Sequence, residues 1–105
     1  MQLSDEQKTA MTTLGIPDYM HGAIIRYYEK GYLPGSFLTA LINNDLKETF
    51  ANADDTNAQC IRNYVMWFYN YAPGGSWGHS NAVQGWVEHI NAERAKEKVS
   101  ESISD

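Results

Sequence analysis

Apolar residues recur along most of the chain at intervals of three and four positions, a spacing that gathers them on one face of an α-helix. The helix expected after Pro17 shows this, because Met20, Ala23, Ile24 and Tyr27 fall at positions i, i+3, i+4 and i+7. Proline suits the first turn of a helix, where its missing amide hydrogen is not needed. No alternating stretch of useful length indicates a β-strand. The pattern therefore predicts an all-α fold.

The sequence also marks the ends of the first two helices. Ser4 and Gln7 have the spacing of a capping box, so a short helix is expected to follow and to stop at Gly15. Gly31 suits a left-handed C-cap for the second helix, with Leu33 folding back on its last turn.

A third helix is expected to begin at Ser36, which can cap it. Asn and Asp favour helix caps over helix interiors. The run Asn43–Asp45 therefore predicts a kink, or a new helix capped near Asn44 or Asp45. The apolar face of this region is formed by Phe37, Leu38, Leu41, Ile42, Leu46 and Phe50.

The next helix is expected to run from about Thr56 to Tyr71 and to stop before Pro73. It is rich in aromatic residues and apolar nearly all round, which is typical of a central helix. Trp67 and Tyr69 flank its main stripe on opposite sides, so we expect them to reach a surface or a second packing face. The stripe consists of Ile61, Tyr64, Val65 and Phe68, and Cys60 and Tyr71 widen it.

A glycine-rich loop that carries Trp77 follows, and Ser80 can cap the last helix. Residues 91–98 are polar and should continue that helix in an exposed state. We expect residues 1–98 to form a single helical domain, a compact bundle of four to six helices around the aromatic-rich helix at about 56–71. A frayed polar tail is expected over residues 99–105. The apolar positions of the last helix are Val83, Trp86, Val87 and Ile90.

The composition is that of a soluble globular domain. Of the 105 residues, 43% are hydrophobic and 20% are charged. No run approaches the ~20 apolar residues that cross a bilayer, and the first residues lack a signal-peptide pattern. Cys60 is the only cysteine, so no disulfide can form within the chain. These features predict no membrane association and a cytoplasmic location.

The net charge of −5 argues against nucleic acid as a partner. Affinity for phosphate backbones depends on clustered Lys and Arg, and the eight basic residues are scattered except near the C-terminus. The alternative is a nucleic-acid-binding protein whose aromatic side chains stack on bases. It would use Arg62 together with Arg94, Lys96 and Lys98.

The histidines do not predict a metal site or a bound cofactor. His21, His79 and His89 are far apart, and His89 has an acidic residue, Glu93, at helical spacing. Zinc sites usually show a tighter grouping of ligands. We therefore expect no metal and no cofactor.

The sequence favours a protein that is not an enzyme, with no catalytic residues to name. Cys60 has no adjacent base of the kind that activates a thiol, so a small buried residue is the simpler interpretation. The acid pairs Asp45 with Glu48 and Asp54 with Asp55 fall where helix caps are expected. The alternative is a small enzyme that uses Asp45 or Cys60.

Contact with another protein is the role that the remaining aromatic residues favour, because Trp and Tyr are common anchors at interfaces. Trp77 either folds onto the core as a lid or contacts a partner. If Trp67 and Tyr69 are exposed together, a homodimer could cover them. The expected partner-binding residues are Trp67, Tyr69, Trp77, His79, Asn44 and Asp45.

A series of short motifs runs from the third helix to the last: PGxFL, NDL, AD with a following Asn, AP, WG and a late Trp. These motifs comprise Pro34, Gly35, Phe37, Leu38, Asn44, Asp45, Leu46, Ala53, Asp54, Asn57, Ala72, Pro73, Trp77, Gly78 and Trp86. From about His21 to Trp86 the chain resembles a group of short uncharacterised proteins encoded by phages, prophages and bacteria. It departs from them at Ser76, where many members have cysteine, and at Ser36, which often corresponds to glycine.

This resemblance implies a phage or mobile-element origin and brings no established activity. If the protein is phage-encoded, the expected cytoplasmic location is that of the host cell. Small accessory proteins of phages often bind and redirect a host protein, including defence nucleases. The resemblance therefore implies an accessory protein that acts by protein–protein interaction. Its partner would be a host or phage protein, and its role that of an inhibitor or adaptor.

Overall fold

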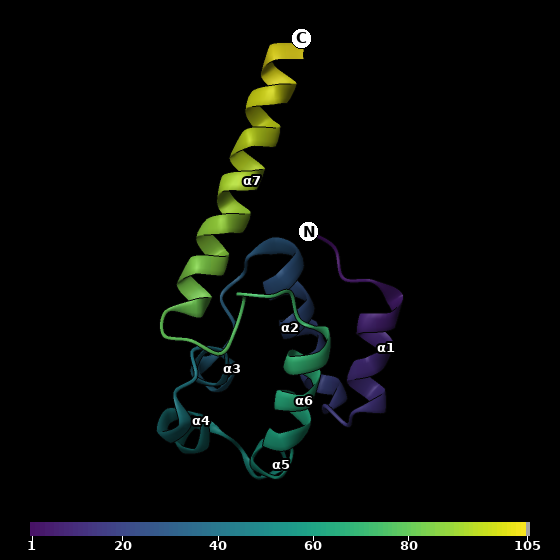
Figure 1. Ribbon diagram of the computed structural model, residues 1–105, viewed down its shortest axis with the longest axis vertical. Helices are drawn as coiled ribbons and strands as arrows, with labels where there is room; N and C mark the ends of the chain where they lie inside the picture. The colour runs from purple at the N-terminus through teal and green to yellow at the C-terminus, as the bar shows by residue number, and fades with distance from the viewer. Residues whose placement is uncertain (105) are drawn as a thin grey trace.

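The computed structural model describes the backbone of residues 1–104 and the side chains of residues 1–96. Within these residues the chain is helical with no β-strand, which confirms the all-α prediction. Residues 1–104 contain seven helices, and the last of them extends from the globule that the others form (Figure 1). They are α1 (Asp5–Thr13), α2 (Asp18–Lys30), α3 (Ser36–Ile42), α4 (Leu46–Asn52), α5 (Asp55–Gln59), α6 (Ile61–Tyr71) and α7 (Ala82–Ser104).

The ends of α1 and α2 follow the local sequence. The Ser4 Oγ atom accepts a hydrogen bond from the Gln7 amide at 3.1 Å, and the Ser4 amide donates to Gln7 Oε1 at 2.7 Å, so the capping box is confirmed. Gly31 ends α2 with φ of 69°, in the left-handed region that favours glycine. The expectation for Leu33 is wrong, since this side chain is 75% exposed. Ile90 of α7 packs against the end of α2 at Gly31 instead.

The predicted break at residues 43–45 is present and separates α3 from α4. Asn44 has φ of 60°, which Asn adopts more readily than most residues. Asp45 then caps α4, because its Oδ1 atom accepts a hydrogen bond from the Glu48 amide at 3.2 Å. The break therefore both ends one helix and starts the next.

Two expectations for this region are wrong. Ser36 is the first residue of α3, and the N-cap position belongs to Gly35, which has no side chain with which to cap. Leu46 and Phe50 are 72% and 53% exposed and do not continue the buried face of α3. The break reorients α4, so that Thr49 is its buried residue.

The single helix expected over residues 56–71 is in fact two helices, α5 and α6, which meet at Cys60. The Cys60 amide donates to the Asn57 carbonyl at 3.0 Å, three residues back, and this tighter turn ends α5. Asp54 caps α5 by accepting from the Asn57 amide at 2.7 Å. The Tyr64 hydroxyl donates to Asn57 Oδ1 at 2.6 Å and joins the two helices.

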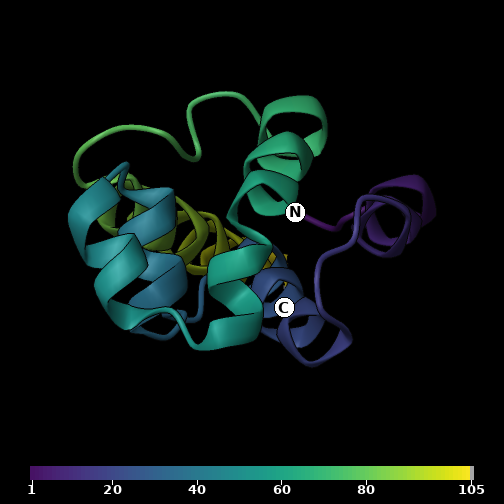
Figure 2. The same cartoon turned by 90° about the horizontal axis from the view of Figure 1, so that it is seen from below.

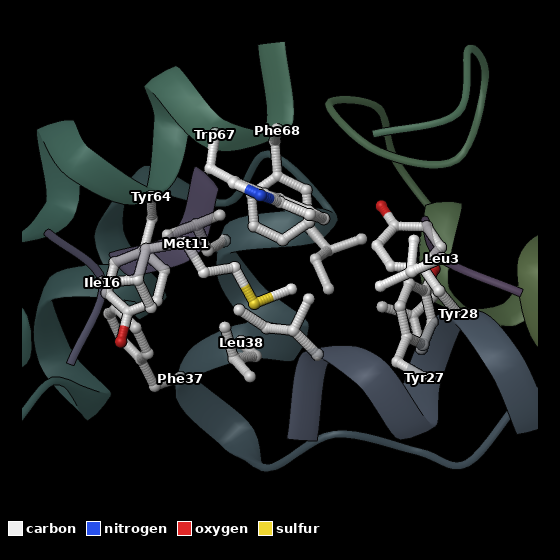
Figure 3. Packing of buried hydrophobic residues seen from close by; sticks show 14 of the residues in the cluster. Leu3, Met11, Ile16, Tyr27, Tyr28, Phe37, Leu38, Tyr64, Trp67 and Phe68 are labelled. Atoms are coloured by element: carbon white, nitrogen blue, oxygen red, sulfur yellow. The ribbon is translucent and has the colours of Figure 1, made fainter. Parts of the chain in front are cut away.

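Helix α6 supplies three buried rings to the core, including its largest, the indole of Trp67. Tyr64, Trp67 and Phe68 are all 0% exposed. In Figure 3, Trp67 and Phe68 point from α6 toward Met11 and Leu38. The Trp67 and Phe68 ring centroids lie 5.1 Å apart with planes at 87°, an edge-to-face contact. Most of the aromatic-rich segment is therefore the inside of the protein.

The buried face of α6 is rotated from the predicted stripe. Trp67, expected to reach a surface or a second packing face, reaches a second packing face. It is wholly buried because α1 packs on its side of α6, and its Nε1–H group donates to the Gln7 carbonyl at 2.9 Å. Val65, expected within the stripe, is 38% exposed. Tyr69 is 76% exposed, so Trp67 and Tyr69 do not form a shared surface patch.

The predicted apolar stripe of α7 is confirmed. Val83 and Ile90 are buried, and Trp86 and Val87 are partly buried against the core. Fraying of residues 99–105 stays a prediction, because their side chains and the whole of Asp105 lie outside the described residues, although α7 is assigned as far as Ser104.

The helices form two groups that meet at α2 and α7. Helix α1 packs against α2 and α6, whereas α3 packs against α4 and α7, and α7 also contacts α2. Figure 2 shows the loop that follows α6 arching toward the side of the molecule that holds α3 and α4. The longest dimension, 52 Å, reflects the projection of α7 beyond the other helices (Figure 1).

Candidate functional site

Asn43 lies where α3, α4 and α7 meet. It is the C-cap residue of α3, and its Oδ1 atom accepts a hydrogen bond from the Val83 amide at 2.9 Å, near the start of α7. One side chain therefore ends α3 and satisfies an amide in the first turn of α7, which would otherwise lack a helical partner. This contact fixes the beginning of α7 beside the break that precedes α4.

Three adjoining hollows all have Asn43 in their linings, and together they form one continuous surface. Their volumes are about 350, 500 and 400 Å³, and Asn43 lines all three. The first and third also share Thr39, and the second and third share Asn81. We call the combined lining of the three hollows the Asn43 surface. It includes Leu33, Thr39, Asn43, Leu46, Asn81 and Val87.

The apolar part of the Asn43 surface lies between α3 and α7. Val83 and Val87 project from α7 on one side of this hollow, and Thr39 and Leu33 belong to its other side. Leu33 is 75% exposed there, and Leu46 of the adjoining hollow is 72% exposed. The two leucines line separate hollows that adjoin, and exposed aliphatic side chains beside a hollow suit contact with another molecule.

The charged part of the Asn43 surface is acidic. Its lining contains Asp45, Glu48 and Glu88 and no Lys or Arg. Asp45 caps α4, Glu48 accepts from the Asn52 side chain at 3.3 Å, and Glu88 accepts from Gln84 at 3.2 Å. Among the side chains of residues 1–96, none of these three carboxylates forms an ion pair.

Hydrogen bonds between buried hydroxyl groups hold the loop over residues 73–81 in place. Ser76 is 1% exposed, and its Oγ atom donates to the Pro73 carbonyl at 2.6 Å. The Tyr28 hydroxyl therefore donates to Ser76 Oγ, at 2.9 Å, and the Tyr27 hydroxyl donates to the Ser76 carbonyl at 3.2 Å. Burial raises the pKa of both tyrosines, so both keep their protons.

The same loop is tied to the Asn43 surface. The Gly78 amide donates to the carbonyl of Ile42, the last residue of α3, at 2.7 Å. Ser80 and Asn81, at the end of the loop, line the second hollow. The positions of Ser80 and Asn81 on the Asn43 surface therefore depend on the buried hydrogen bonds around Ser76.

Three of the predicted partner-binding residues lie on the Asn43 surface or beside it. Asn44 and Asp45 both line the Asn43 surface. His79 is exposed next to Ser80 of the same surface, and its ring nitrogens face the carbonyls of Gly75 and Ser80, each at 3.0 Å. These two carbonyls raise the pKa of His79.

The remaining predicted contact residues do not line this surface. Tyr69 is exposed on α6, and Trp67 is in the core. Trp77 is partly buried, with its ring centroid 5.6 Å from that of Phe68, so it packs as a lid on the core.

The residues of the enzyme alternative have structural roles. Asp45 and Asp54 both act as N-caps, which confirms the capping interpretation. Asp54 also accepts from the Tyr19 hydroxyl at 2.8 Å, and this bond raises the pKa of Tyr19. Cys60 is partly buried at the α5–α6 junction. The part of the chain with described side chains holds no group of three or more His, Cys, Asp or Glu placed to bind a metal ion.

The basic residues of the nucleic-acid alternative lie on two different helices. Arg62 is exposed in the first turn of α6. Arg94, on α7, donates to the Lys30 carbonyl at the end of α2. Lys96 is exposed, and the side chain of Lys98 lies outside the described residues. The nucleic-acid alternative stays an untested prediction.

The sequence does not predict several features of the Asn43 surface. It predicts Asn43 only as part of a break, because nothing local shows that it caps a distant helix. Val83 and Val87 belong to the buried stripe as predicted, but a helical stripe does not reveal that they also line a hollow at its edge. The exposure of Leu33 and Leu46 also depends on how the helices are packed.

Comparison with known proteins adds no relative to this picture: no family model, curated protein or solved structure matches the chain. Within the described residues, none of the helices combines the length and the apolar character that a bilayer crossing requires.

Proposed function

We propose that the protein is a small non-enzymatic accessory protein of phage type, which binds a host or phage protein through the Asn43 surface as an inhibitor or adaptor. The observation that supports this most directly is the Asn43 surface itself. It combines hollows with two leucines, Leu33 and Leu46, that are more than 70% exposed. Burying such aliphatic side chains against a partner contributes about 1.5–3 kcal/mol for each one fully covered.

The motifs that carry the resemblance support the same surface. Pro34, Asn44, Asp45 and Leu46 all line its hollows. Other positions of the motifs are in the core, such as Phe37, which is buried. The resemblance thus combines residues that build the fold with residues that are available to a partner.

The proposal is tested by capturing partners from bacterial lysate with the tagged protein. The double variant Leu33→Ser and Leu46→Ser removes the exposed aliphatic groups without opening the core. We expect it to lose a partner that the wild-type protein retains. Tyr69→Ser is the matched control, because Tyr69 is equally exposed but is not part of the Asn43 surface. A partner retained equally by the double variant would contradict the proposal.

A further inference from the structure

We infer that the occupant of the Asn43 surface is a basic amphipathic helix of a partner protein, whose apolar face enters the hollow between α3 and α7. This inference rests on the proposed function and adds the chemistry of the partner. It depends on two properties of one place: an apolar floor and a rim whose charges are all negative.

The floor suits aliphatic side chains. The hollow between α3 and α7 holds about 400 Å³ and has Leu33, Val83 and Val87 in its lining. A groove of this kind accepts the apolar face of a helix, with anchors spaced at i, i+3, i+4 and i+7. Thr39 and Gln84 at its sides can hydrogen-bond to polar groups at the edge of such a face.

The rim selects the charge of the occupant. Glu88 lies beside the apolar hollow, and Asp45 and Glu48 line the hollow that adjoins it across Thr39 and Asn43. Among the residues whose side chains are described, no Lys or Arg lines any of the three hollows and none forms an ion pair with these three carboxylates. Lysines or arginines flanking the apolar face of a partner would complement this rim and speed association, whereas acidic residues would be repelled.

Two synthetic helical peptides test this inference with the full chain. Both have leucines at i, i+3, i+4 and i+7, and their flanking positions are lysines in one and glutamates in the other. Fluorescence anisotropy should show the lysine peptide binding at least about tenfold more tightly at low salt. Because the rim is exposed, its preference should shrink as salt is raised.

Charge-reversed variants locate the binding. Glu48→Lys combined with Glu88→Lys should weaken the lysine peptide by about tenfold, since it reverses two of the three rim charges. Asp5→Lys combined with Glu6→Lys is the matched control, because it makes the same change in net charge beside a separate hollow of about 370 Å³ on α1. Circular dichroism confirms that each variant is folded.

Each outcome bears on the inference. Equal affinity for the two peptides, no binding of either, or a loss only in the α1 control variant would overturn it. The proposed function fails separately, if partner capture from lysate is unchanged in the Leu33 and Leu46 double variant. Capture that depends on those leucines, together with peptides that bind regardless of charge, would leave the proposed function standing and remove only the basic partner.

Discussion

The aromatic core beside α6 buries its apolar side chains, whereas the Asn43 surface exposes two of its leucines. In the core, the rings of Tyr64, Trp67 and Phe68 are completely covered. On the Asn43 surface, side chains cap the first turns of α4 and α7, while Leu33 and Leu46 are left open to solvent. The comparison teaches that most aromatic side chains of the sequence serve cohesion, and that the apolar side chains of the Asn43 surface, which lie among polar and acidic ones, are aliphatic.

Polar atoms are satisfied in the core as fully as apolar ones are covered. Among the described residues, no buried side-chain nitrogen or oxygen lacks a hydrogen-bond partner. Trp67 donates to a backbone carbonyl of α1, and Tyr28 donates to Ser76 of the loop. These bonds leave the core rings with no free polar group for a ligand, which supports looking for function at the surface.

The largest expected effect comes from removing a core ring. Trp67→Ala should lower the free energy of unfolding by about 3–5 kcal/mol, because it removes a fully buried indole and leaves a cavity. Urea unfolding followed by circular dichroism measures the loss. Tyr69→Ala, two residues away and 76% exposed, should change stability by less than about 0.5 kcal/mol. Similar losses in both variants would contradict the division between a core face and an exposed face of α6.

The contact between α2 and α7 joins the two regions and should respond next. Gly31→Ala should cost about 2 kcal/mol, because φ is 69° and an added Cβ atom would lie 3.0 Å from two atoms of Ile90. Gly85→Ala should instead stabilise the protein by about 0.5–1 kcal/mol, since this residue is inside α7 with nothing within 4 Å of the new methyl group. Thermal unfolding of the two variants should give shifts of opposite sign, and a shared sign would count against this packing.

Substitution of Asn43 tests how much its hydrogen bond to the first turn of α7 contributes to stability. Asn43→Ala should cost about 1 kcal/mol, because the Val83 amide loses its acceptor. Asn43→Asp keeps an acceptor at the same place and should lose less, which urea unfolding can resolve. Equal losses would show that the hydrogen bond to α7 is not the reason for the effect.

The smallest effect is expected at His79, which is fully exposed. Its pKa is raised from 6.5 because the Gly75 carbonyl and then the Ser80 carbonyl accept from its ring nitrogens. A pKa that is higher in the folded state means that the contribution to stability is complete below pH 6.5 and is lost as the pH rises through the folded-state pKa. The unfolding midpoint of His79→Gln, relative to wild type, should therefore be lower at acidic pH and converge above that pKa. An NMR titration of the ring measures the shift directly, and a pKa below 6.5 would contradict the two contacts.

Much of the fold could be predicted from local signals. The capping box at Ser4, the left-handed Gly31 and the break that ends with Asp45 capping α4 are all set by residues within four positions of one another. The split at Cys60 was missed, because an apolar stripe continues across it and only the hydrogen bond to Asn57 ends α5.

The candidate site was predictable only in part. Asn44 and Asp45 were expected to contact a partner, and both line the Asn43 surface. Trp67 was also expected to contact a partner, but it is buried because α1 covers its side of α6. Helical periodicity places Trp67 at the edge of the apolar stripe. An edge position can face either solvent or a neighbouring helix, and the spacing of residues does not distinguish the two.

The sequence by itself determined that the chain is helical, where most helices begin and end, and that its rings are mostly internal. Those properties depend on backbone capping and on helical periodicity, which act over a few residues. Only the tertiary structure decided that Asn43 caps α7 from 40 positions away and that Leu33 and Leu46 stay exposed beside acidic side chains. Such features depend on how helices that are distant in the sequence are placed against each other, which no local pattern specifies.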